Sequence, residues 1–247
     1  MRILAIESSA LTASVALCDE FNILAQYSVY HKKTHSQTLL PMIDEIMRMS
    51  ELTPSDLDAV AVTKGPGSFT GLRIGMASAK GLCLALDIPV IAVSTLEALA
   101  ANLIGSRENI SPIMDARRNQ VYTGLYDALR LPKALEKERA IGILQWIDIL
   151  NKRGEAVAFL GDAVAVHADT IAKSIKVPFR FASANQLLQS AASLSVIAVD
   201  YYKKGIFADV DGLVPEYLRL SQAERERQEK LKENQSESNV EAQSAEK

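Results

Sequence analysis

The order of predicted elements indicates an α/β protein with two similar halves. Three strands, followed by alternating helices and strands, are predicted before Gly105-Ser106, a pair suited to a hinge. The second half begins again with consecutive strands and continues with helices and strands. This repetition indicates a duplicated fold with a cleft between two lobes. A chain of 247 residues, 48% of them hydrophobic, is long enough to bury a core in each lobe.

The first half is predicted to begin with three strands joined by tight turns, at Ile3–Ile6, Ser14–Leu17 and Ile23–Tyr30. Apolar residues at helical spacing then predict a helix over Ser36–Ser50, with Ser36 as its N-cap. The half is completed by a short turn at Thr53-Pro54, strand Ala59–Thr63, helix Gly71–Leu86, strand Ile88–Val93, and a helix that begins with the capping box Ser94-Thr95-Leu96-Glu97 and runs to about Leu103.

The second half is predicted to open with two strands, Ile110–Asp115 and Gln120–Tyr126, joined by the turn Ala116–Asn119. The charged stretch Leu131–Ala140 is predicted to be an excursion outside the sheet. The remaining elements are helix Trp146–Leu150, strand Val157–Leu160, helix Ala168–Ile175, strand Pro178–Phe181 and the long helix Asn185–Lys203.

These elements predict a division of the chain into three parts. Residues 1–104 form the first lobe, 105–220 the second lobe, and 221–247 a charged tail. The tail is rich in Glu, Lys, Gln, Ser and Asn, with Leu231 and Val240 as its only large aliphatic residues. Burial of so little apolar surface cannot offset the entropy of ordering, so disorder or a fraying helix is expected.

Composition excludes several classes of protein. The net charge is −3, of which the tail contributes −2, so the folded body lacks the basic surface that gripping nucleic acid alone requires. Two cysteines, Cys18 and Cys83, stand among apolar residues and predict buried thiols in a reducing compartment. No apolar run approaches the roughly 20 residues of a membrane span, and the N-terminus lacks the pattern of a signal peptide. We therefore expect a cytoplasmic protein with no membrane contact.

The most informative segment is TKGPGSFTGLRIGMASAKGLCLAL, residues 63–86. It joins a predicted strand to a helix through a loop that contains Gly65, Gly67 and Gly71. Glycines allow close approach of a ligand or partner, and a helix N-terminus favours an anion. The segment lacks the ending of a P-loop and the spacing of a Rossmann fingerprint. A tight turn that uses glycines for geometry alone is an equally good interpretation. The candidate ligand or structural positions are Gly65, Gly67, Ser68, Phe69, Thr70, Gly71 and Arg73.

The helix after this loop is apolar almost all round, which predicts burial on more than one side, by its own domain or by another protein. Small residues four apart, Ala77, Gly81 and Ala85 among them, permit close approach of a second helix. Together with helix Ser36–Ser50, it is predicted to dock against the matching helices of a partner. The candidate partner-binding residues are Leu39, Ile43, Met47, Leu72, Met76, Ala79 and Cys83.

Other chemical groupings give weaker signals. His31 and His35 have the spacing of two metal ligands, but they straddle a strand end, so an ordinary exposed pair is the better interpretation. The sequence Glu7-Ser8-Ser9 ends the first strand, as an acidic residue and hydroxyls do in actin-like phosphotransferases; an ordinary turn would give the same pattern. Asp115 with Arg117 and Arg118 ends a strand at the equivalent place in the second half, where a salt bridge is the commoner explanation. No Ser/His/Asp set can be assembled from three histidines.

Several blocks resemble the bacterial TsaB family: ILAIESS, HSQTLLPMI, VTKGPGSFTGLRIGMASAKGL, IPVIAVSTLEALA, PIMDARRNQVYTGLY and VPEYLR. The resemblance runs from Arg2 to about Leu220, and GPGSFTGLRIG is its most specific part. It implies a two-lobed ASKHA (actin-like, Hsp70-like) fold. It also implies a non-catalytic role beside the paralogue TsaD in making threonylcarbamoyladenosine in tRNA.

In TsaD the segment that corresponds to IAVSTLEALA carries a metal-binding H-x-x-x-H pair. Thr95 and Leu99 stand at those two places here, and leucine cannot bind a metal. The resemblance therefore implies no metal or cofactor of this chain's own, with nucleotide and metal bound only in a complex with TsaD and the ATPase TsaE. It also implies a homodimer when the chain is alone, and contact with tRNA only through the complex.

Two other function classes fit the sequence less well. A metallopeptidase of the glycoprotease type shares the fold but would need ligands where Thr95 and Leu99 stand. A free-standing actin-like ATPase would need a phosphate-binding loop in both halves, and the second half offers only Gly161-Asp162. Both are disfavoured against the non-catalytic subunit.

Overall fold

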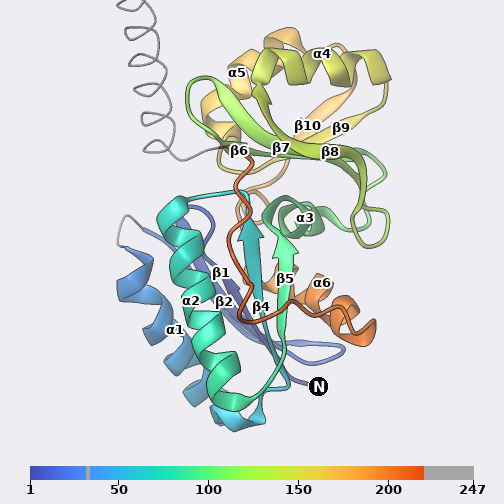
Figure 1. The fold of residues 1–247 in the computed structure, drawn as a ribbon. Helices are drawn as coiled ribbons and strands as arrows, with labels where there is room; N and C mark the ends of the chain where they lie inside the picture. Colours follow the sequence, from blue (N-terminus) through green and yellow to red (C-terminus); the bar gives the residue numbers. More distant parts are fainter. Residues whose placement is uncertain (32–33, 220–247) are drawn as a thin grey trace, which may run out of the picture.

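The computed structural model describes residues 1–31 and 34–219, which form two lobes, each built on a five-stranded mixed sheet (Figure 1). The first sheet contains β1 (Ile3–Glu7), β2 (Thr12–Cys18), β3 (Ile23–Tyr30), β4 (Ala59–Gly65) and β5 (Val90–Ser94), in the order β3-β2-β1-β4-β5. The second contains β6 (Asn109–Asp115), β7 (Gln120–Asp127), β8 (Lys133–Gly142), β9 (Val157–Leu160) and β10 (Phe179–Phe181), in the order β10-β9-β6-β7-β8.

Both sheets follow one strand order. In each, the first strand is central, pairs antiparallel with the second and parallel with the fourth, and the third and fifth strands form the edges. The predicted α/β fold with two similar halves is therefore confirmed.

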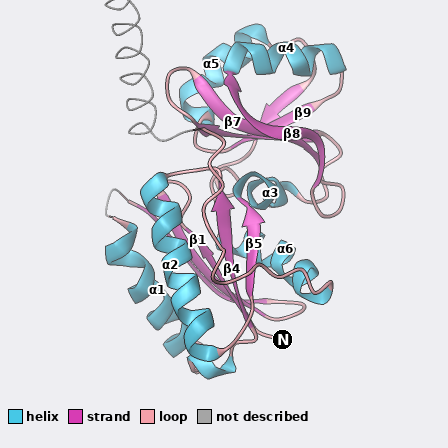
Figure 2. Ribbon diagram, viewed as in Figure 1, coloured by secondary structure: helices cyan, strands magenta, loops and turns pink. Residues whose placement is uncertain are grey.

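Helices cover the sheets in layers (Figure 2). In the first lobe, α1 (His35–Met49) and α2 (Phe69–Leu86) lie together on one face, and α6 (Ala191–Lys203) lies on the other. In the second lobe, α4 (Ile143–Arg153) and α5 (Val164–Ser174) pack on one face of the sheet. The short α3 (Thr95–Ala100) lies between the lobes and shares a core with β6 and β7.

Helix α6 differs from the sequence-based division, which assigned all of residues 105–220 to the second lobe. Its buried residues Leu194, Ile197 and Ala198 pack with Ala5 and Ala16 of the first sheet. The chain thus returns to the first lobe because that sheet has a second apolar face to cover. The helix is also shorter than predicted, beginning at Ala191. The tail assigned to 221–247 lies outside the described residues.

Helix starts were predicted with mixed success. The N-cap at Ser94 is confirmed, because its hydroxyl accepts hydrogen bonds from the amides of Leu96 and Glu97. The N-cap at Ser36 is wrong: α1 begins one residue earlier, and Thr34 stands at its N-cap without a side-chain hydrogen bond.

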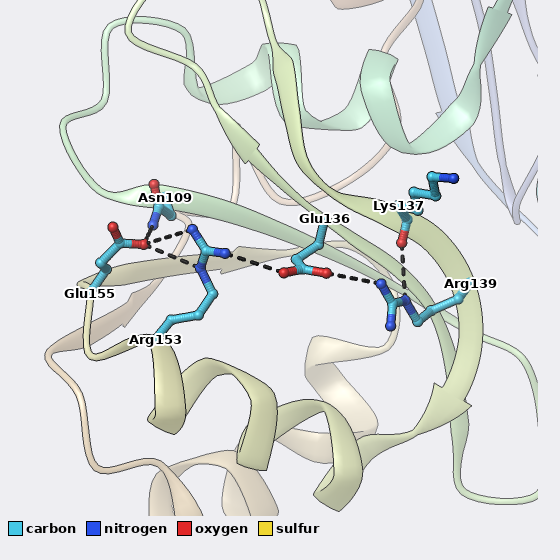
Figure 3. Close-up of polar contacts among 6 residues, drawn as sticks. All are labelled: Asn109, Glu136, Lys137, Arg139, Arg153 and Glu155. Carbon is cyan, nitrogen blue, oxygen red and sulfur yellow. Dashed lines mark hydrogen bonds and ion pairs between the residues drawn. The ribbon is translucent and has the colours of Figure 1, made fainter.

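The charged stretch predicted as an excursion is the edge strand β8. Its side chains form a network of ion pairs (Figure 3). The Glu136 carboxylate accepts hydrogen bonds from Arg139 at 2.9 Å and Arg153 at 3.2 Å, and Arg153 also pairs with Glu155 at 3.1 Å. Charged residues on an edge strand discourage pairing with other sheets. They also hide the alternating apolar pattern by which a strand is recognised in sequence.

At the other edge of the second sheet, strand β10 is held by an ion pair between Arg180 and Glu108. The Glu108 carboxylate accepts a hydrogen bond from Arg180 Nε of β10 at 2.9 Å and one from the Ser106 hydroxyl. The Arg180 and Ser106 side chains lower the pKa of Glu108 to about 2. Since the folded-state pKa lies below the ordinary value, the ionised form stabilises the fold above about pH 4.5, and this contribution is lost as the pH falls towards 2.

We predict that Glu108→Gln lowers the free energy of unfolding near neutral pH by less than about 1 kcal/mol, because both partners are partly exposed. The deficit should shrink as the pH falls below about 4.5. Urea unfolding across this pH range measures it. Asp148→Asn, an exposed carboxylate of α4, is the control and should show no such trend. A deficit that is constant with pH would contradict the assignment.

Candidate interaction surface around the glycine-rich loop

The glycine-rich loop between β4 and α2 is packed against the turn after β1. A Cβ atom added at Gly67 would lie 2.3 Å from the Ser9 carbonyl oxygen, and one at Gly71 would lie 2.1 Å from the Ser8 carbonyl oxygen. The Ser68 amide donates to the Ser9 carbonyl at 2.6 Å, and the Ser8 hydroxyl donates to the Gly71 carbonyl at 2.9 Å. These glycines therefore allow two backbone segments to come into direct contact.

The same loop is covered by a C-terminal strap, residues 206–219, which crosses the first lobe (Figure 1). The Glu216 amide donates to the Lys64 carbonyl at 2.7 Å, and its carboxylate pairs with Lys64 Nζ at 2.7 Å. The Tyr217 ring stacks on Phe69 with 3.7 Å between centroids. Arg73 lies over the Phe69 ring and donates to the Tyr217 hydroxyl at 3.1 Å.

Contacts at both ends hold the strap in place. Lys80 Nζ on α2 donates to the carbonyls of Asp211 and Leu213 at 3.0 and 3.2 Å. At the other end Arg219 donates to the Ala116 carbonyl of the second lobe at 2.6 Å. The sequence analysis missed this segment, although VPEYLR belongs to it and Lys80 is one of few polar residues in α2.

The geometric interpretation of the loop is thus the better supported. The Ser68 amide is bonded to Ser9, the Gly71 amide to the Ser68 side chain, and the Glu216 backbone lies where a side chain on Gly65 would project. These groups are occupied by the chain itself and are not directed at a ligand. Thr70 is exposed at the start of α2.

The residues predicted to bind a partner do not form an outer surface, and that expectation is wrong. Each is at most 7% exposed, and all lie on the buried sides of α1 or α2: Leu39, Ile43, Met47, Leu72, Met76, Ala79 and Cys83. The apolar stripe of each helix faces the first sheet, which supplies the second apolar surface.

The outer face of α2 is nevertheless small and apolar. Its exposed positions recur every three or four residues: Thr70, Arg73, Ala77, Gly81, Leu84 and Ala85. Leu84 is 63% exposed, and Leu40 on the neighbouring α1 is 57% exposed. A shallow groove of about 320 Å³ lies beside Arg73, Ile74 and Ala77. A helix with such a face suits close contact with another helix.

The acidic residues at strand ends have different surroundings. Glu7 is 1% exposed and its carboxylate accepts a hydrogen bond from the Ser9 amide at 2.7 Å; burial raises its pKa. Asp115 forms the predicted salt bridge, with Arg117 at 3.1 Å. Its neighbour Asp162, which the sequence singled out only as part of Gly161-Asp162, accepts a hydrogen bond from the Asp115 amide at 3.3 Å, and burial and the Asp115 charge raise its pKa. Arg118 is exposed on the same turn.

The histidine pair does not form a metal site. The expected exposed pair is correct for His31 but wrong for His35, which is buried because its ring packs inward at the start of α1, where its Nε2 donates to the Ala10 carbonyl at 2.7 Å. Within residues 1–31 and 34–219, no group of three or more His, Cys, Asp or Glu side chains is placed to hold a metal ion. Thr95 and Leu99 are buried in α3. In that same part of the chain, every helix is too short or too polar to cross a bilayer.

Comparisons with known proteins agree with this architecture. The family model of TsaD, tRNA N6-adenosine threonylcarbamoyltransferase, matches residues 23–227. The tRNA threonylcarbamoyladenosine biosynthesis protein TsaB of Bacillus subtilis (strain 168) is 40% identical over 91% of this chain and 96% of its own length. The chain belongs to the TsaB family. TsaB of Escherichia coli (strain K12) is 38% identical over 51% of this chain and 55% of its own.

Solved structures with a similar fold are known. YeaZ from Pseudomonas aeruginosa has a TM-score of 0.73 and 26% identity, covering 88% of this TsaB-family chain and 100% of that one. The ethanolamine utilization protein EutJ from Carboxydothermus hydrogenoformans, at 8% identity and a TM-score of 0.50, shares the fold alone, covering 81% and 90%. The fold is of the ASKHA type, as the resemblance implied.

Two substitutions test whether the loop glycines are needed for packing. We predict that Gly71→Ala lowers the free energy of unfolding by about 1–3 kcal/mol, because the new methyl group would meet the Ser8 carbonyl. Gly81→Ala, in the same helix with no atom within 4 Å of the added Cβ, should be neutral or stabilise by up to about 1 kcal/mol. Chemical denaturation measures both. Equal effects would contradict a packing role for Gly71.

A third substitution tests the strap. We predict that Tyr217→Ala loosens the glycine-rich loop, because it removes a ring stack that contributes on the order of 1 kcal/mol and the hydroxyl that Arg73 contacts. Amide hydrogen exchange should become faster in residues 64–71 and at Glu216. Tyr30→Ala, at a tyrosine 64% exposed on β3, is the control and should leave these amides unchanged. Unchanged exchange in Tyr217→Ala would show that the strap does not hold the loop.

Proposed function

We propose that this TsaB-family chain is a non-catalytic subunit in the biosynthesis of threonylcarbamoyladenosine in tRNA. In this role it pairs with TsaD, so that the threonylcarbamoyl group of threonylcarbamoyl-AMP is transferred to N6 of adenine 37 in tRNAs that read codons starting with A. Similarity to B. subtilis TsaB along nearly the whole of both chains is the observation that carries the proposal.

The residues at the positions where TsaD binds its metal disfavour a catalytic role for this chain. Thr95 and Leu99 are buried in α3, and leucine offers no ligand atom. The glycine-rich loop is occupied by Ser9 and Glu216 of the same chain. These features disfavour both a glycoprotease-type metallopeptidase and a free-standing actin-like ATPase. Nucleotide and metal would then enter only in the complex, with TsaE as a further partner.

The pairing surface is proposed to be the outer face of α1 and α2. Ala77, Gly81 and Ala85 would let a partner helix approach closely, while Leu40 and Leu84 supply apolar area. A TsaD family model matches this chain, so the two proteins would share a fold and could pair like with like through matching helices. In the absence of TsaD, the same surface would join two copies of this chain. TsaD would supply most of the contacts to the tRNA phosphates, because this chain carries a net charge of −3 and lacks the basic surface that such contacts need.

The experiment is reconstitution of tRNA modification. The purified chain alone should form no threonylcarbamoyladenosine and show no ATP turnover near 1 s⁻¹, a rate ordinary for enzymes. Addition of TsaD and TsaE with ATP, threonylcarbamoyl-AMP and tRNA should give the modified nucleoside, detected by mass spectrometry. Modification or metal-dependent turnover by the chain alone would overturn the proposal.

A matched pair of variants tests the surface. Ala77→Asp places a charge on the outer face and should abolish co-purification with TsaD while the chain stays folded. Ala79→Asp places it in the core, 0% exposed, and should cost several kcal/mol and prevent folding. Val166→Asp, 64% exposed on α5, is the control and should pair normally. Normal pairing by Ala77→Asp would place the interface elsewhere.

A further inference from the structure

We propose that the carboxyl end of the first sheet binds a monovalent cation against the carboxylate of Glu7, in a buried polar cluster near the start of α6. The cluster consists of Glu7, Ser9, Thr12 and Thr63, with Gln189 assigned to it from its place two residues before Ala191, and none of these residues is more than 4% exposed. No part of the proposed pairing with TsaD depends on this site.

Strand register brings the cluster together. Ile6 of β1 pairs with Val62 of β4, so Glu7 and Thr63 are neighbours on adjacent strands and share the face that α6 covers. Ser14 lies directly opposite Glu7 on β2, and Thr12 projects from the same face two residues away. The Ser14 hydroxyl accepts a hydrogen bond from the Ala191 amide at 3.0 Å, which fixes the start of α6 at this place. Gln189 precedes it by two residues.

The cluster contains an unusual number of polar atoms without partners. The hydroxyls of Ser9, Thr12 and Thr63 and both amide atoms of Gln189 are buried and make no well-formed hydrogen bond in the described structure. Buried polar groups are normally paired, and each unpaired one costs about 1–3 kcal/mol. Burial raises the pKa of Glu7, while the Ser9 and Thr63 side chains lie close enough to its carboxylate to act in the opposite direction. A cation that takes several oxygen ligands would give a partner to the hydroxyls of Ser9, Thr12 and Thr63 and to the amide oxygen of Gln189.

The oxygen atoms of the cluster indicate which kind of ion would bind there. Carboxylate, hydroxyl and amide oxygens are ligands for hard cations. Among the described residues, no basic side chain forms an ion pair with Glu7, so its charge would otherwise be buried alone. One carboxylate balances one positive charge, whereas a divalent ion would leave a net charge in the interior. A phosphate is excluded by charge and by the contact of the Ser8-Ser9 turn with the glycine-rich loop.

Thermal unfolding of the full chain in potassium, sodium or choline chloride at equal ionic strength tests the proposal. Potassium or sodium should raise the midpoint saturably over choline, by about 5 °C when the ion is 100-fold above its dissociation constant. Thallium-205 NMR with thallous nitrate in chloride-free buffer should show a bound signal that potassium nitrate displaces. Equal midpoints in the three salts, with no bound thallium, would mean a protonated Glu7 among ordered waters and would overturn the proposal.

Variants assign the effect to this cluster. Glu7→Gln should lose both the salt response and the thallium signal. Glu97→Gln, which alters another largely buried carboxylate that accepts a hydrogen bond from Tyr201, should keep both. If Glu7→Gln does not fold, Thr63→Val removes one hydroxyl ligand at nearly constant shape, and its salt response should be weakened. Wild-type responses in either Glu7→Gln or Thr63→Val would overturn the assignment.

Discussion

The first lobe depends on the close contact between the turn after β1 and the glycine-rich loop. Side chains at Gly67 or Gly71 would overlap the carbonyls of Ser9 and Ser8, so the two backbones can meet only where glycine stands. This contact sets the start of α2, and through α2 the positions of α1 and of the strap. An arrangement that could have cradled a phosphate in a related fold is here a packing contact between parts of one chain.

One face of α2 packs in the core of the first lobe, and the opposite face is exposed to solvent. Its inner stripe is buried in the core with α1 and the first sheet, whereas its outer stripe is made of small residues and Leu84. A helix that is apolar almost all round therefore serves its own lobe on one side and leaves the other side available. The exposed groove beside Arg73 and Ala77 lies on this outer side, next to the ring stack of Phe69 and Tyr217.

Much of the fold could be predicted from the sequence because its strands are short, apolar and bounded by turn residues. Strands Ile23–Tyr30 and Val157–Leu160 were predicted with the bounds that the structure shows. Strand β8 was missed because its charged residues satisfy one another at the edge of the sheet. For the two helices that cover one face of the first sheet, the sequence predicted that they exist but not which side of α2 faces solvent, since both sides are apolar and only the position of the sheet decides between them.

The duplicated strand order conceals an asymmetry in how the two cores are completed. The core under α4 and α5 is made from residues 113–187 and is closed by local segments, whereas the first sheet receives one of its layers from α6, more than a hundred residues after β4. During synthesis on the ribosome, the second lobe therefore has all its layers before the first lobe does. The opening strands must wait with one apolar face uncovered until α6 emerges, which makes the early chain the part most exposed to aggregation or to capture by chaperones.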